Sequence, residues 1–169
     1  ETRIDIVSAK HLESSILNAL FQAHPYEEVA HELFTLENKN HHIGMGMIGE
    51  LEDPMSETDF LTFVKQRMKC EIIRHSKQLE HPIKKVAVLG GSGSFAISAA
   101  KAAGADAFVT SDLKYHDFFR AENQILLMDI GHYESEQYTK NLLASYLKKK
   151  IPNFAVLLSK INTNPVKYK

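Results

Sequence analysis

The residues best suited to chemistry lie where an apolar run gives way to a predicted helix. Residues 125–128 are apolar, and the helix that begins after Gly131 carries His132 and Glu136. Because these two residues are four apart, their side chains share one face of the first helical turn. One imidazole and one carboxylate can be two ligands of a metal site. The same residues also suit a capped helix start with an acid near its positive end, so both interpretations stay open.

Polar loops follow each of the four strands predicted in the second half of the chain. From about residue 83 the pattern alternates strand and helix, which predicts a parallel sheet covered by helices. Ligands bind at the carboxyl ends of the strands in such sheets. We therefore expect four loops to meet along one edge: residues 90–94, 110–117, 129–136 and 159–165.

Two of these loops carry further candidates. Asp112 can supply a carboxylate and His116 a proton shuttle, although an N-cap and a surface histidine are simpler interpretations. The glycine-rich loop 90–94 can cradle a phosphate or form a tight structural turn. It lacks the lysine of a phosphate-binding P-loop.

The first half of the chain has a different order of predicted strands and helices. Up to about residue 82 the pattern reads strand, helix, strand, strand, helix, strand, which predicts an antiparallel sheet with both helices on one face. The fold class is thus α/β plus α+β, with domains at residues 1–82 and 83–169. The adjacent pair His41 and His42 is predicted to be a solvated turn, because neighbouring side chains on an extended chain point apart.

Composition excludes several classes of function. The chain has 169 residues and a net charge of −1, with no basic stripe for nucleic acid. Its longest apolar runs, such as residues 154–158, are too short to span a bilayer. Cys70 is the only cysteine, which suits a reducing compartment and a cytoplasmic location. The chain begins with Glu1, so we expect a processed chain or a piece of a longer protein.

Seven segments along the chain are distinctive when taken together: residues 24–30, 44–51, 86–94, 104–110, 112–117, 131–136 and 162–166. On these segments the chain resembles the NIF3-like (DUF34) family, often labelled GTP cyclohydrolase 1 type 2 homologue.

The resemblance implies a C-terminal fragment of such a protein. Residues 1–82 would be the ferredoxin-like inserted domain, similar to PII and CutA proteins, and residues 83–169 half of the metal-binding α/β domain. The family pattern implies two divalent metal ions per intact subunit, with His132 and Glu136 as ligands. The remaining ligands, a histidine pair and an aspartate, would come from the absent N-terminal half; His41 and His42 do not correspond to that pair. Such a donor set suits Zn, Mn, Fe or Ni.

The cyclohydrolase label implies a hydrolase-like reaction in which a metal-activated water attacks the imidazole ring of GTP. His116 or Asp112 would move protons, and the fragment alone would be inactive. The alternative is a non-catalytic metal-holding scaffold or regulator whose inserted domain assembles subunits or senses a ligand. The resemblance also implies a homohexamer with trimeric caps and a possible small-molecule or nucleotide ligand, without nucleic-acid or membrane partners.

Overall fold

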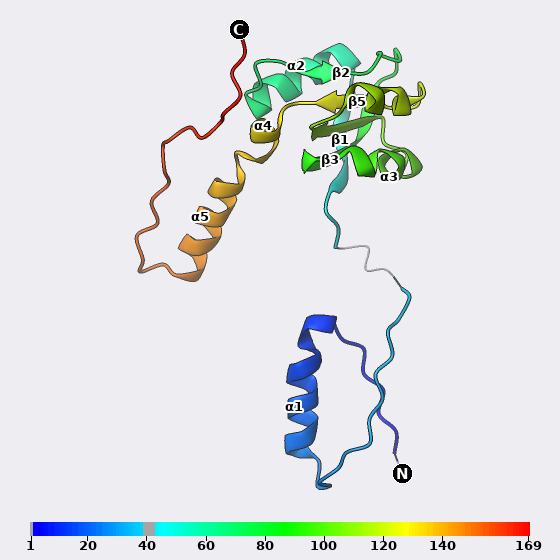
Figure 1. Ribbon diagram of the computed structural model, residues 1–169, viewed down its shortest axis with the longest axis vertical. Coiled ribbons are helices and arrows are strands. Elements are labelled where there is room, and N and C mark those ends of the chain that lie inside the picture. The colour runs from blue at the N-terminus through cyan, green and yellow to red at the C-terminus, as the bar shows by residue number, and fades with distance from the viewer. Residues whose placement is uncertain (1, 39–42) are drawn as a thin grey trace. The chain divides into compact units, whose positions relative to one another are not determined.

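The computed structural model describes residues 2–38 and 43–169, and the chain divides into two compact units (Figure 1). The division lies between His41 and His42, whereas the sequence pattern predicts a boundary near residue 82. The pair His41 and His42, predicted to be a solvated turn, lies outside the described residues.

The N-terminal unit is built around one helix. A short 3-10 helix, η1 (Lys10–Leu12), leads into α1 (Glu13–Ala23). The strands predicted for residues 3–9 and 28–37 are absent from the described part of this unit. These segments approach each other through Arg3 and Glu32, whose charged atoms are 3.9 Å apart, but no ladder of backbone hydrogen bonds joins them. Without such a ladder an alternating sequence stays extended but is not a strand.

The C-terminal unit contains a five-stranded mixed sheet in the order β1-β3-β4-β5-β2. The central strands β3 (Ile83–Ser92), β4 (Ala107–Ser111) and β5 (Leu126–Asp129) are parallel, as the sequence predicts. The edge strands β1 (Met47–Met55) and β2 (Arg74–His75) pair antiparallel with β3 and β5. The ferredoxin-like sheet predicted within residues 1–82 is therefore not formed by these strands, because each finds its partner in the parallel region.

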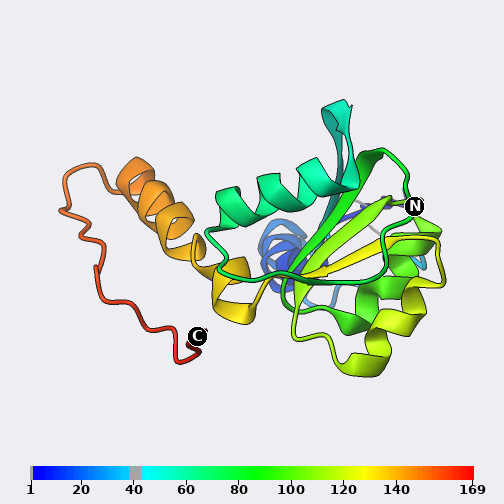
Figure 2. The same ribbon diagram turned by 90° about the horizontal axis from the view of Figure 1, so that it is seen from above.

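Helices cover both faces of this sheet. Figure 2 shows α2 (Glu57–Met68) on one side and α3 (Ile97–Ala102) on the other. The short helices η2 (Ser94–Ala96) and η3 (Tyr115–Ala121) flank α3 on its side. This layering is the mixed α/β architecture expected when apolar strands are buried on both faces.

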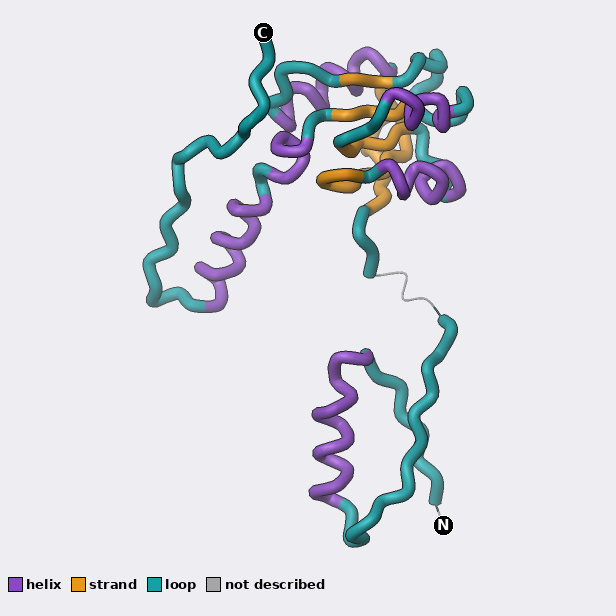
Figure 3. Tube along the Cα trace, viewed as in Figure 1, coloured by secondary structure: helices purple, strands orange, loops and turns teal. Residues whose placement is uncertain are grey.

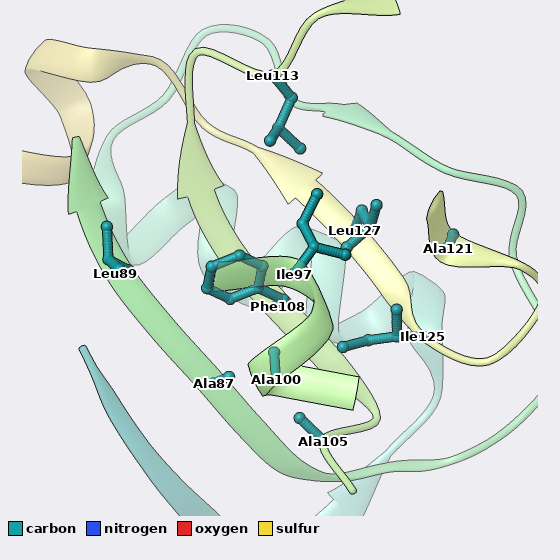
Figure 4. Close-up of a cluster of buried hydrophobic side chains, with 10 residues drawn as sticks. All are labelled: Ala87, Leu89, Ile97, Ala100, Ala105, Phe108, Leu113, Ala121, Ile125 and Leu127. Atoms are coloured by element: carbon teal, nitrogen blue, oxygen red, sulfur yellow. The ribbon is translucent and has the colours of Figure 1, made fainter. Parts of the chain in front are cut away.

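Strand β4 shows why both faces need a cover. Phe108 points to the α3 side, while Ala107 and Val109 point to the α2 side, and all three are buried. Burying a side chain of the size of Phe108 contributes about 1.5–3 kcal/mol. Figure 4 shows the core on the α3 side, which consists of Ala87, Leu89, Ile97, Ala100, Ala105, Phe108, Leu113, Ala121, Ile125 and Leu127.

Two helices and an irregular tail follow β5. These are α4 (His132–Glu136), α5 (Thr139–Lys150) and residues 151–169, which contain neither helix nor strand (Figure 3). The strand predicted at residues 154–158 is absent: Phe154 is 70% exposed and Leu157 91% exposed. Strand β5 is already paired on both sides, by β4 and β2, so it offers no free edge to this segment. Every helix within residues 2–38 and 43–169 is too short or too polar to span a bilayer.

Candidate functional site

The carboxyl ends of the three parallel strands meet at one edge of the sheet. In the register of the sheet, Ser92 at the end of β3 lies opposite Ser111 of β4, and Thr110 of β4 lies opposite Asp129 of β5. The loops that leave these strands therefore start at nearly the same level. For these three loops, the predicted meeting at one edge is confirmed.

Side chains from the three loops form a connected cluster. The Ser92 hydroxyl donates to Oδ2 of Asp112 over 2.5 Å, and the same oxygen lies 2.6 Å from Nδ1 of His132. On the other side of the ring, Nε2 of His132 lies 3.4 Å from Oε2 of Glu136. The predicted neighbours His132 and Glu136 thus share a face, and Asp112, from a different strand end, joins them.

Glycines let the first turn of α4 approach β3 closely. Gly91 has a φ of +70°, and a Cβ there would lie 2.7 Å from Oε1 of Glu136. Its N–H donates to the Ser135 hydroxyl over 2.9 Å. Gly131, with a φ of +89°, turns the chain from β5 into α4. Both positions need a left-handed backbone, which glycine adopts without steric cost.

A buried carboxylate fixes the backbone beneath the cluster. Asp129 is 5% exposed and pairs with Arg74 of β2. It also accepts hydrogen bonds from the N–H groups of Leu113, over 2.9 Å, and of Gly131, over 3.1 Å. Arg74 in turn donates to the Leu113 carbonyl over 2.8 Å. One side chain therefore ties the loop of Asp112 to the turn before His132.

The charges in the cluster favour the ionised pair. Burial would raise the pKa of Asp112, but hydrogen bonds from Ser92 and His132, with the positive charges of His132 and Arg74, hold it below the usual 3.8. The hydrogen bond to Asp112 raises the pKa of His132 above 6.5 against the opposing effect of partial burial. The negative charges of Asp112 and Glu136 raise that pKa further.

The C-terminal tail also reaches this edge, although it forms no strand. The Asn164 amide donates to Oε1 of Glu134 over 3.0 Å, and Glu134 is only 7% exposed. A cavity of about 520 Å³ lies between α4 and the tail, lined by His132, Glu136 and Ile161 among others. The fourth loop predicted at the edge, residues 159–165, is therefore present there.

The second catalytic candidate lies outside the cluster. His116 is exposed on η3, and among the described residues it makes no hydrogen bond or ion pair with Asp112, His132 or Glu136. Its role in proton transfer stays a prediction.

The donor set fits part of a metal site. Within the described ranges, no group of three or more His, Cys, Asp or Glu side chains is arranged to hold a metal ion. Two donors each about 2.1 Å from a tetrahedral ion lie about 3.4 Å apart. The 3.4 Å between His132 Nε2 and Glu136 Oε2 matches this separation. These two atoms therefore fit as a pair of ligands that needs further donors.

Sequence reasoning missed the residues that support the cluster. Ser92 lies in the glycine-rich loop, for which the sequence suggests a phosphate cradle or a tight turn, and the sequence pattern predicts no supporting role for Asp129 or Arg74. Asp129 carried one signal: it is a carboxylate ending a fully apolar strand, where it needs a donor or a cation as partner. The partner itself depends on the pairing of β2 with β5, which the local pattern does not reveal.

Comparison with protein families gives a match over most of the chain. The family model described as Duf34/NIF3 (NGG1p interacting factor 3) matches residues 4–165. A Staphylococcus epidermidis protein named GTP cyclohydrolase 1 type 2 homolog is 38% identical over 155 residues, covering 89% of this chain and 42% of the relative. A Bacillus subtilis protein of the same name is 35% identical over 173 residues, covering 98% of this chain and 45% of the relative.

Solved structures give the same result for the fold. A Bacillus cereus protein related to NIF3 superposes with a TM-score of 0.73 at 33% identity, over 94% of this chain and 45% of that one. A Staphylococcus aureus protein superposes with a TM-score of 0.75 at 30% identity, over 95% of this chain and 53% of that one. The chain spans about half the length of these relatives.

Proposed function

The chain belongs to the Duf34/NIF3 family, and we propose that the sheet edge around His132 and Glu136 is part of a divalent-metal centre in a hydrolase-like protein. The observation that carries the proposal is the 3.4 Å separation of His132 Nε2 and Glu136 Oε2. Both side chains are about half exposed, so a cation can reach them. Neither residue belongs to the buried core, which leaves them free for function.

The residues of this chain would bind and orient a metal ion but would not supply all of its ligands. His132 and Glu136 would bind, and the backbone around Gly91 and Gly131 would keep their helical turn against the end of β3. A bound divalent ion supplies Lewis acidity and lowers the pKa of a bound water. Protein metal sites of this kind need three or more protein ligands, so the other ligands must come from elsewhere.

The cavity beside the two ligands is the proposed place for a substrate. Its walls come from residues 132–140 and 159–168, and His132 and Glu136 form part of its lining. The curated relatives are named GTP cyclohydrolase 1 type 2 homolog, and on that name the substrate would be a guanine nucleotide attacked by water. Two ions per subunit, the hexamer with trimeric caps and the inserted PII/CutA-like domain remain predictions for a protein of the relatives' full length.

Zinc binding tests the proposal on this chain. We expect weak, saturable binding of Zn²⁺ when it is measured in competition with a chromophoric chelator, because two protein ligands bind less tightly than three or four. His132→Ala and Glu136→Gln should remove it. His81→Ala is the matched control, since His81 is an exposed histidine just before β3. Equal zinc binding by all four proteins would overturn the proposal.

A second experiment separates catalysis from a metal-holding scaffold. Formate release from GTP should occur with the metal-loaded Bacillus subtilis relative and not with the 169-residue chain beside it. The absence of formate from the metal-loaded relative would favour the scaffold.

A further inference from the structure

The two nitrogens of the His132 ring have different carboxylate neighbours. Nδ1 lies 2.6 Å from Asp112, within hydrogen-bonding distance, while Nε2 lies 3.4 Å from Glu136. A neutral imidazole carries one N–H, and an ionised carboxylate can only accept. The hydrogen of the neutral ring therefore belongs on Nδ1, where the close acceptor is. Nε2 then carries the lone pair on the side of Glu136.

Asp112 is itself held in place from two strands. It has a left-handed backbone, with a φ of +57°, which aspartate tolerates better than most residues. Its carboxylate accepts a hydrogen bond from the Ser92 hydroxyl at the end of β3. The next residue, Leu113, is fixed through both its N–H and its carbonyl by Asp129 and Arg74. The carboxylate is thus set in position by contacts that do not involve His132.

We propose that Asp112 is a positioning residue that fixes the tautomer and the orientation of His132, so that Nε2 and Glu136 face one point as donors for a divalent cation. The inference rests on the metal centre proposed above and adds a role that the two ligands alone do not provide. A carboxylate on the far nitrogen of a ligand histidine fixes its ring and makes it more basic. The Ser92 hydroxyl donates a hydrogen bond to the same carboxylate, so the glycine-rich loop also helps to position Asp112.

The first test reads the tautomer in the metal-free chain. Long-range ¹H–¹⁵N correlation spectra, recorded where the ring is neutral, should show His132 as the Nδ1–H form. Asp112→Asn should shift it toward the Nε2–H form, because the amide can donate to Nδ1 as well as accept from it. Asparagine also tolerates the left-handed backbone, so the fold should survive. An Nε2–H ring in the unsubstituted chain would overturn the inference.

The second test measures Zn²⁺ affinity. Asp112→Asn should weaken binding by about 10- to 100-fold, as is usual when the partner of a ligand histidine is lost. Glu80→Gln is the matched control: Glu80 is also an exposed acid with a left-handed backbone, at a φ of +59°, but it lies in the loop between β2 and β3. Unchanged affinity in Asp112→Asn would contradict the positioning role.

The two tests keep this inference separate from the metal proposal. If the chain binds zinc through His132 but the ring is Nε2–H, the metal centre stands and the role of Asp112 is wrong. If the ring is Nδ1–H and responds to Asp112→Asn while zinc does not bind, Asp112 positions the ring and the metal proposal is wrong.

Discussion

Nδ1 of His132 lies 2.6 Å from Oδ2 of Asp112, although the two residues follow different strands and are twenty positions apart in the chain. The contact exists because β4 and β5 are parallel and in register, which brings the loops after Ser111 and Asp129 together. The fold thus places a carboxylate behind the imidazole and leaves the other nitrogen facing Glu136.

The Asp112–His132 pair should make stability depend on pH in a defined window. The pKa of His132 is raised, so its contribution is complete below its usual 6.5 and is lost as the pH rises through the raised value. The pKa of Asp112 is lowered, so its contribution is present above its usual 3.8 and is lost as the pH falls through the lowered value. The pair should therefore stabilise the folded chain most between the two usual pKa values, 3.8 and 6.5.

Thermal unfolding of the chain and of Asp112→Asn across about pH 3–9 checks this window. Because both side chains are about half exposed, we expect a difference of less than about 1 kcal/mol, largest near about pH 5. A difference that grows steadily as the pH rises above this window would contradict the ionised pair.

Cys70 should be unreactive and should make the protein less stable at high pH. Burial raises its pKa to about 11, with a further rise from Glu134 and an opposing effect of Lys65. The neutral thiol is thus favoured in the folded state, a contribution present below the usual 9.0 and lost as the pH rises through about 11. By about pH 10 the folded chain should lose about 1 kcal/mol relative to about pH 8 through this group.

Cys70→Ala provides the comparison, because it removes the titrating group. Chemical denaturation at about pH 8 and about pH 10 should show a smaller loss in Cys70→Ala than in the unsubstituted chain. At the lower pH, a thiol reagent should modify Cys70 only after unfolding. Rapid modification of the folded chain would show that the thiol is not protected.

Gly91→Ala should disrupt the cluster more than it disrupts the sheet. The new Cβ would meet Oε1 of Glu136 at 2.7 Å and would force a left-handed backbone on alanine. We expect a cost of about 1–2 kcal/mol and a shift of the Glu136 and His132 NMR signals. Gly49→Ala in β1 is the matched control, because a Cβ added at Gly49 would meet no atom within 4 Å. Equal effects of the two substitutions would count against the close approach.

Asp129→Ala should be the most destabilising change at this edge. It leaves the Arg74 guanidinium and the Leu113 and Gly131 N–H groups without their acceptor. Breaking a buried charged pair costs about 3–5 kcal/mol, and the half-exposed Arg74 places the expected loss near about 3 kcal/mol. Urea denaturation measures the loss. A change below about 1 kcal/mol would show that Asp129 does not tie the two loops together.

The sequence predicts the parallel strands well because their signal is local. Continuous apolar runs at β3, β4 and β5, each followed by polar residues, determine both the strands and the edge where Asp112, His132 and Glu136 meet. Helical spacing alone places His132 above Glu136. These parts of the site follow from continuous apolar runs and from the helical period of about 3.6 residues.

The edge strands could not be assigned from the same pattern. The segments that form β1 and β2 read as strands in either arrangement, and only long-range pairing decides that β1 joins β3 and β2 joins β5. The tail at residues 154–158 shows the reverse case: its apolar run predicts a strand, but β5 offers it no free edge within the described sheet. Ser92 and Arg74 were missed for the same reason, since their roles depend on partners distant in the chain.

Paramagnetic broadening by Mn²⁺ tests the central claim, the pairing of His132 and Glu136 as metal ligands, most directly. In ¹H–¹⁵N spectra of the chain, substoichiometric Mn²⁺ should broaden the amide signals of Gly91 and of residues 132–136 before all others. This pattern should vanish in His132→Ala and persist in His81→Ala. Broadening centred on other residues, or unchanged by His132→Ala, would contradict the account.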